Sequence, residues 1–142
     1  MSKGNTFEND LLKLIFNATA IANIADNAVT SPLTNLYVSL HTADPGEAGN
    51  QTTNECAYTS YARVAVARSG AGWTVTANSV SPAATITFPA ATGGTETATY
   101  AGFGTDASGA GKLLYSGAIS PTITISSGVT PRLTTATAIT ED

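Results

Sequence analysis

The stretch from Leu36 to Cys56 reads LYVSLHTADPGEAGNQTTNEC, and it divides into two parts. Apolar side chains at Leu36, Val38 and Leu40 alternate with more polar ones, which is the two-residue period of a half-buried strand. The residues that follow have neither the helical nor the strand period. The stretch therefore predicts a strand that runs into a long contact loop at residues 43–58.

The two-residue period continues along the rest of the chain. Apolar and β-branched residues recur in short runs about ten residues apart, with Gly, Pro, Asn and Ser between them, as in antiparallel sandwiches and barrels. The pattern predicts a mainly β fold, an antiparallel jelly-roll-like β-sandwich or barrel of about eight strands. The runs after the first are YARVAVARS, GWTVTANS, ATITFPA, ETATYAGFGT, KLLYSGAI, TITISSG and RLTTATAIT.

The N-terminal segment has a different period. Phe7, Leu11 and Leu14 recur at steps of four and three residues, which gives one apolar stripe and predicts an α-helix. We expect this helix to fade by Asp26 and Asn27. The predicted organisation is a single domain over residues 1–142, with a helical segment at 1–30 and the β-sandwich at 34–142.

The composition argues against several classes of protein. Only 11% of the 142 residues are charged, against about 25% in an average domain. The six basic residues are scattered and the net charge is −4, which disfavours nucleic acid as a partner. No apolar run approaches the length of a membrane span, so no membrane partner is expected. Without an apolar signal segment, we expect synthesis in the cytosol.

Few residues of the sequence could form a catalytic or metal site. His41 and Cys56 are the single histidine and the single cysteine, but no orienting group or oxyanion hole accompanies them. We expect His41 on the outer strand face and a structural or incidental role for both residues. Asp44, Glu47 and Glu55 have no regular ligand spacing and are expected to be solvated acids. The prediction is a non-enzymatic protein with no catalytic residues, metal or cofactor.

Several of these runs together resemble a known family. Small structural proteins of tailed bacteriophages, commonly described as tail-fibre-like, share this pattern from Leu36 onward, and SLHTADPGEAG is its most specific part. The architecture is also similar to that of phage head cement proteins. The resemblance implies assembly inside a bacterium and residence in the virion. It is carried by LYVSLHTADPGEAGNQ, YARVAVAR, GWTV, ITFPAATGG, TYAGFGT, GKLLYSGAI and SSGVTP.

The function predicted on this basis is a capsid cement or decoration protein. Such a protein would sit on the capsid surface and bridge subunits of the major capsid protein, with self-association as a dimer or trimer. The alternative is a tail or tail-fibre component in host attachment, with carbohydrate binding as one version of it. Cement is preferred because 142 residues show no shaft segment or repeat.

The contact residues are expected in the loop and on the N-terminal helix. If the loop is a separable arm, deletion of residues 46–54 should leave the domain folded and abolish incorporation into particles. The predicted protein-contact residues are Phe7, Leu11, Asp44, Pro45, Gly46, Glu47, Asn50, Gln51 and Asn54.

Overall fold

The computed structural model describes residues 5–21 and 32–141. Over these residues the fold is mainly β, with nine strands in antiparallel sheets and one N-terminal helix, which confirms the predicted class, although about eight strands were expected. The chain forms two compact units, each assembled from separate stretches. The first unit comprises Met1–Asn35, Ala67–Thr85 and Thr134–Asp142, and the second comprises Leu36–Val66 and Ile86–Leu133.

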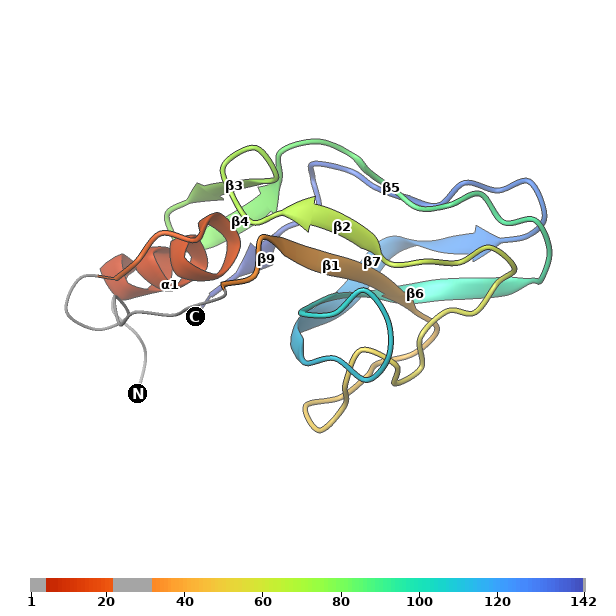
Figure 1. Ribbon diagram of the computed structural model, residues 1–142. Helices are drawn as coiled ribbons and strands as arrows, with labels where there is room; N and C mark the ends of the chain where they lie inside the picture. Colours follow the sequence, from red (N-terminus) through yellow and green to blue (C-terminus); the bar gives the residue numbers. More distant parts are fainter. Residues whose placement is uncertain (1–4, 22–31, 142) are drawn as a thin grey trace. The chain divides into compact units, whose positions relative to one another are not determined.

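The first unit contains the helix and a small sheet. Helix α1 (Asn5–Asn17) contacts β3 (Trp73–Thr76) and β4 (Ser79–Pro82), and β4 also pairs with β9 (Ile139–Thr140) (Figure 1). Leu12 and Phe16 are fully buried, and the Phe16 ring meets the Trp73 ring edge to face at 4.8 Å between centroids. The apolar stripe of the helix thus closes this unit's core.

The end of helix α1 is fixed by two local features. Ala18 adopts a left-handed backbone (φ 54°), and the Thr19 amide donates to the Lys13 carbonyl, so the chain turns back over the last turn of the helix and ends it. The Arg68 guanidinium donates to the carbonyls of Leu14 and Ile15, which the helix leaves unpaired. The predicted extension toward Asp26 and Asn27 falls on residues 22–31, which lie outside the described residues.

The second unit contains the four-stranded sheet that positions the candidate site. Its strand order is β2 (Val64–Ala67), β1 (Asn35–His41), β6 (Glu96–Gly104) and β7 (Leu113–Ile125) (Figure 1). A separate pair, β5 (Ile86–Thr87) with β8 (Arg132–Leu133), lies in the same unit. Within the described residues, the four-stranded sheet is open, with β2 and β7 at its edges.

Strand register separates the two faces of this sheet. Val38 lies opposite Phe103 and Leu40 opposite Ala101, so these four buried apolar side chains share one face. On that side the Tyr61 hydroxyl accepts from the Leu40 amide, and the Tyr61 ring stacks near Phe88. This is the apolar core of the unit.

The other face carries small and polar residues. Ser39 lies opposite Gly102 and His41 opposite Tyr100, and Gly102 lies opposite Ser116 of β7. Ser39 and His41 are fully buried, although alternation alone assigned them to the outside. The expectation that His41 lies on the outer strand face is therefore wrong, and the loop after β1 explains why.

Three strand boundaries also differ from the expected ones. The runs KLLYSGAI and TITISSG form the single strand β7, which bulges where Ile119–Thr122 face only Thr99 of β6. The run RLTTATAIT is split between β8 and β9. Strand β4 was not predicted, because its hairpin with β3 turns at Ala77 with φ 52°, a conformation that alanine seldom adopts.

Candidate functional site

Hydrogen bonds hold together the two ends of the long loop that follows β1. The Thr42 amide donates to the Asn54 carbonyl at 2.8 Å, and His41 forms an isolated bridge with Glu55. Within the loop the Asp44 carboxylate accepts from the Gly46 amide at 2.9 Å, and the Asn54 side chain donates to the Asp44 carbonyl at 2.9 Å. The loop is therefore an ordered, internally bonded structure rather than an extended arm.

Gln51 anchors this loop to the turn between β6 and β7. Gln51 is fully buried. Its backbone N–H donates to the Gly111 carbonyl at 3.0 Å, and its side-chain Oε1 accepts from the backbone N–H of Asp106 at 2.9 Å. A side chain at Gly104 or Gly111 would overlap the Gln51 side chain. The glycines of the GFGTDASGAG run thus serve a turn, as predicted, and they also make room for Gln51.

Arg63 ties the same two segments together through a buried ion pair. Its guanidinium donates to both oxygens of Glu55, at 2.7 and 2.8 Å, and to the carbonyls of Asp106 and Gly109, at 2.9 and 2.8 Å. The hydrogen bonds that Arg63 donates to the Glu55 carboxylate raise the pKa of Arg63. Glu55 was expected to be a solvated acid, but in the structure its carboxylate binds the Arg63 guanidinium. We call Arg63, Glu55 and the two backbone carbonyls of Asp106 and Gly109 the polar clamp.

His41 completes the polar interior beneath the loop. Its Nδ1 donates to the Thr53 carbonyl at 2.8 Å, which leaves Nε2 to accept from the Ser39 hydroxyl at 2.8 Å. Burial lowers the pKa of His41, which favours the neutral ring that this arrangement requires.

Cys56 is buried as well, and burial raises the pKa of its thiol to about 12. Both ring nitrogens of His41 already have other partners, so His41 is not placed as the base of a Cys–His pair. The structural roles expected for His41 and Cys56 agree with these contacts.

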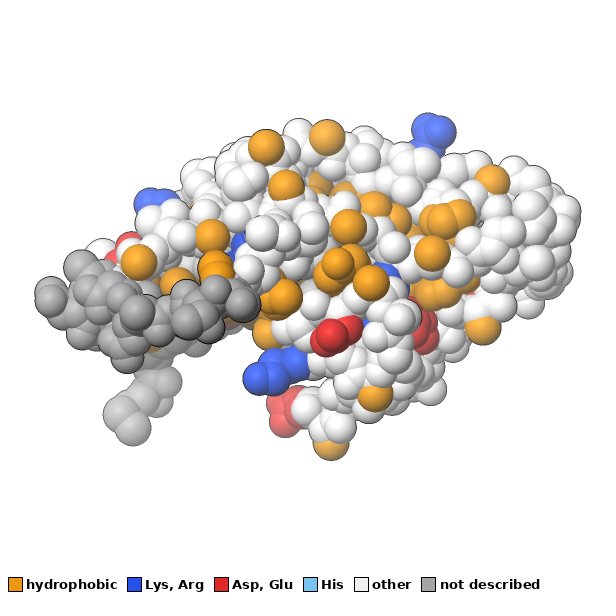
Figure 2. All heavy atoms as spheres, in the orientation of Figure 1, with side chains coloured by type: hydrophobic (Ala, Val, Ile, Leu, Met, Phe, Trp, Pro, Cys, Tyr) orange, Lys and Arg blue, Asp and Glu red, His pale blue; other side chains and the backbone are white. Residues whose placement is uncertain are grey.

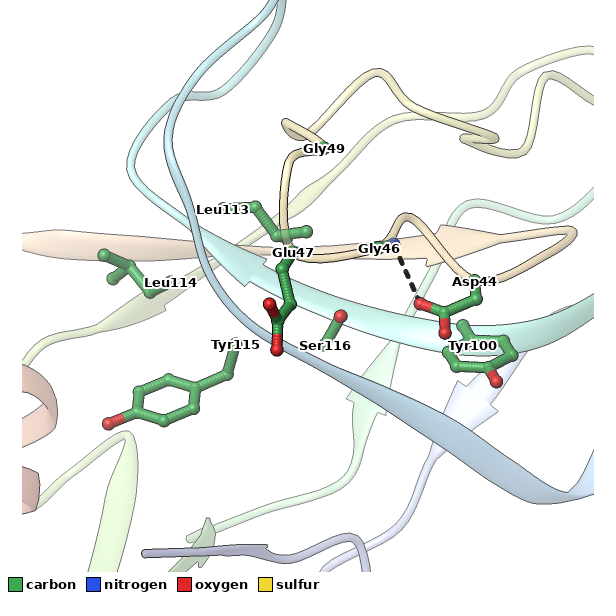
Figure 3. Close-up of a pocket in the computed structure, with 9 residues that line it drawn as sticks. All are labelled: Asp44, Gly46, Glu47, Gly49, Tyr100, Leu113, Leu114, Tyr115 and Ser116. Carbon is green, nitrogen blue, oxygen red and sulfur yellow. Dashed lines mark hydrogen bonds between the residues drawn. The ribbon is translucent and has the colours of Figure 1, made fainter.

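Beside the clamped loop lies an open pocket of about 560 Å³, which we call the Tyr100 groove (Figure 3). One side is the loop, and the floor is the polar face of β6 and β7. In Figure 3 the Glu47 side chain points toward the floor near Ser116, whereas the Tyr115 ring is turned away. The residues that line the groove are Asp44, Gly46, Glu47, Gly49, Tyr100, Leu113, Leu114, Tyr115 and Ser116.

The polar groups in the Tyr100 groove are mostly acceptors. One Asp44 oxygen accepts from Gly46, whereas the Glu47 carboxylate has no hydrogen bond or ion pair within the described part of the chain. Tyr100 is half-buried and lines the groove together with Ser116. A half-buried aromatic ring with free carboxylate oxygens suits a polyhydroxylated ligand, whose hydroxyls can donate.

The structure places the predicted contact residues in three settings. Asp44, Gly46 and Glu47 line the groove, and Phe7 and Leu11 lie on helix α1 in the other unit, where Phe7 is 40% exposed. The remaining four shape the loop: Pro45 and Gln51 are buried, Asn50 accepts from the Thr52 amide and hydroxyl, and Asn54 bonds to Asp44.

The floor of the groove was missed from the sequence. Tyr100 and Ser116 come from β6 and β7, more than forty residues beyond the end of the loop. The alternation within each strand indicates which residues share a face, but not which strand pairs with which loop. The turn glycines at Gly104 and Gly111 were the available signal that something large fills the space beside them.

Further observations bear on metal binding, membrane spanning and surface charge. Over residues 5–21 and 32–141, no three side chains of His, Cys, Asp or Glu are grouped so that they could bind a metal ion. Helix α1 is too short and too polar to cross a membrane, and it is the only helix in this part of the chain. Charged side chains are also sparse on the face seen in Figure 2.

Comparison with known proteins identifies the family. A family model described as podophage GP4 fiber I protein gp80 matches residues 2–140, nearly the whole chain. No curated protein matches the chain significantly. The matched family is one of non-enzymatic fibre structural proteins, so the predicted class of phage virion structural protein is confirmed.

The same match corrects the preferred function. The capsid cement prediction rested on compactness and on the absence of a shaft, and a match to a fibre family over residues 2–140 overturns it. The tail-fibre alternative is the better supported one. A chain of 142 residues without an evident shaft segment or repeat can therefore belong to a fibre family, which the argument for cement did not allow for.

Proposed function

The chain belongs to the podophage GP4 fiber I protein family, and from that premise we propose that it binds carbohydrate on the host cell surface. The binding site is the Tyr100 groove. Host attachment was the alternative function expected from the sequence, and a fibre is the part of a particle that can reach a cell surface.

One observation carries this proposal: a half-buried tyrosine ring lines the same groove as the Glu47 carboxylate, which has no hydrogen bond or ion pair within the described residues. An aromatic ring offers apolar contact area to the C–H face of a sugar ring, and it is rigid, so little conformational entropy is lost. The Glu47 carboxylate and the Ser116 hydroxyl can then accept hydrogen bonds from sugar hydroxyls.

The rim of the groove is held in place before any ligand arrives. Asp44 and Gly46 are bonded to each other, and the loop that carries them is fixed by the buried Gln51 and by the Glu55–Arg63 pair. A preorganised rim lowers the ordering cost of binding, which matters for a weak ligand such as a sugar.

The test is glycan binding by the purified protein, measured on an array of bacterial surface polysaccharides. We expect the wild type to bind, and we expect Tyr100→Ala to lose at least about tenfold in affinity with its folding intact. Tyr37→Ala is the matched control, because Tyr37 on β1 is also half-buried but does not line the groove. The proposal fails if no glycan binds, or if Tyr100→Ala binds as well as Tyr37→Ala.

The expected partners stay predictions. Self-association as a dimer or trimer is supported only by the low charge of the chain, and light scattering of the purified protein tests it. Contact with a major capsid protein was tied to the cement hypothesis. No nucleic-acid or membrane partner is proposed, and assembly in the host cytoplasm is still an expectation.

A further inference from the structure

The charges around the Tyr100 groove all have one sign. Two of its nine lining residues are acidic, Asp44 and Glu47, and none of the nine is Lys, Arg or His. Arg63 cannot compensate them, because its guanidinium is buried and bound to Glu55. Lys112 is exposed, but it is not one of the lining residues. A ligand in this groove therefore meets two carboxylates and no cation of the groove itself.

We infer that the groove accepts uncharged sugars and excludes acidic ones, such as uronic or sialic acids, and that Glu47 sets this selectivity. The inference rests on the proposed function and names the class of glycan. A sugar carboxylate placed beside Glu47 would face a like charge over a few ångströms, and no cation among the lining residues offsets this repulsion.

The two acids of the groove have different roles. The Asp44 carboxylate accepts from the Gly46 amide, and its backbone carbonyl accepts from the Asn54 side chain, so Asp44 shapes the loop. The Glu47 side chain is exposed, has no partner within the described residues, and points toward the floor near Ser116 (Figure 3). Glu47 can therefore lose its charge without disturbing the loop, whereas Asp44 cannot be changed so freely.

The experiment compares pairs of glycans that differ only by a sugar carboxylate, across an array that contains many such pairs. We expect the wild type to bind the neutral member of a pair at least about tenfold more tightly than the acidic member. Glu47→Gln should remove most of this preference, so that the two members of a pair bind within about threefold of each other. Added salt should narrow the gap for the wild type.

Asp10→Asn is the matched control, because it removes one negative charge from helix α1 in the other unit. It should leave the preference for neutral sugars unchanged. Acidic glycans that bind the wild type as tightly as neutral ones would overturn the inference, and so would an unchanged preference in Glu47→Gln. Either result leaves glycan binding itself intact. Failure of every glycan to bind would instead overturn the proposed function, and the inference with it.

Discussion

Both faces of the β2–β1–β6–β7 sheet are buried at residues 38–41 of β1, but by different means. On one face Val38, Leu40 and Phe103 form an apolar core, where burial is favourable without any particular geometry. On the other face Ser39 and His41 are just as buried, beneath a loop that satisfies them with hydrogen bonds. The comparison shows that alternation in a sequence separates two faces without telling which of them meets water.

The two faces should also respond differently to change. An apolar core tolerates substitutions that keep its volume, whereas a buried polar cluster depends on every partner being present. Removal of one member leaves the others buried and unsatisfied. This difference can be tested by single substitutions, beginning with the one that should have the largest effect.

Arg63→Ala should destabilise the protein by about 3–5 kcal/mol, because it leaves the Glu55 carboxylate largely buried without its partner. Chemical denaturation of the purified variant measures this loss. Arg132→Ala is the control, since Arg132 is exposed on β8 and should change the free energy of unfolding by no more than about 0.5 kcal/mol. If both variants unfold at the wild-type midpoint, the polar clamp does not stabilise the loop.

Gly102→Ala should cost about 1–3 kcal/mol, because its new methyl group would overlap Ser39 and His41. Gly117→Ala provides the comparison on β7, where an added methyl group meets nothing within 4 Å. That variant should be neutral or slightly stabilising. Thermal unfolding of the two alanine variants decides the matter, and equal midpoints would mean that the polar face is loosely packed.

The smallest expected effect is a dependence of stability on pH. Burial lowers the pKa of His41 below its ordinary value of 6.5, so the unfolded chain takes up this proton at a higher pH than the folded one. The contribution of His41 to stability is therefore fully present above pH 6.5 and is lost as the pH falls toward the folded pKa. Unfolding in denaturant at pH 7.5 and 5.5 measures the loss.

His41→Gln is the control for this prediction. His41 is the only histidine of the chain, so the variant should lose most of the difference in stability between the two pH values. A wild type that is equally stable at both would show that water reaches the ring and that the polar face is not sealed.

The sequence predicted the classes of element well and the relations between them poorly. The periods of two and of three to four residues indicated strands and helix α1, because these periods are local properties of the backbone. The deletion experiment on residues 46–54 shows the limit. It treated the loop as a separable arm, although Gln51 is fully buried, so we now expect that deletion to destabilise the fold. The partners of Gln51 lie more than fifty residues away, at Asp106 and Gly111.

For the same reason, the sequence predicted the rim of the candidate site but not its floor. Its rim at Asp44, Gly46 and Glu47 belongs to the loop that the absence of either period marked as unusual. Its floor depends on the register of β6 against β7, including the bulge opposite Thr99. Register follows from pairing between distant strands, and a single sequence does not reveal it.

The buried cysteine gives the protein an internal reporter of its own opening. Cys56 is 3% exposed, and burial raises the pKa of its thiol to about 12, so almost no reactive thiolate exists at neutral pH while the fold is closed. An aromatic disulfide reagent should therefore label the native protein only as fast as the unit around Cys56 opens. The labelling rate would then time these openings in an unmodified chain, even one assembled into a particle.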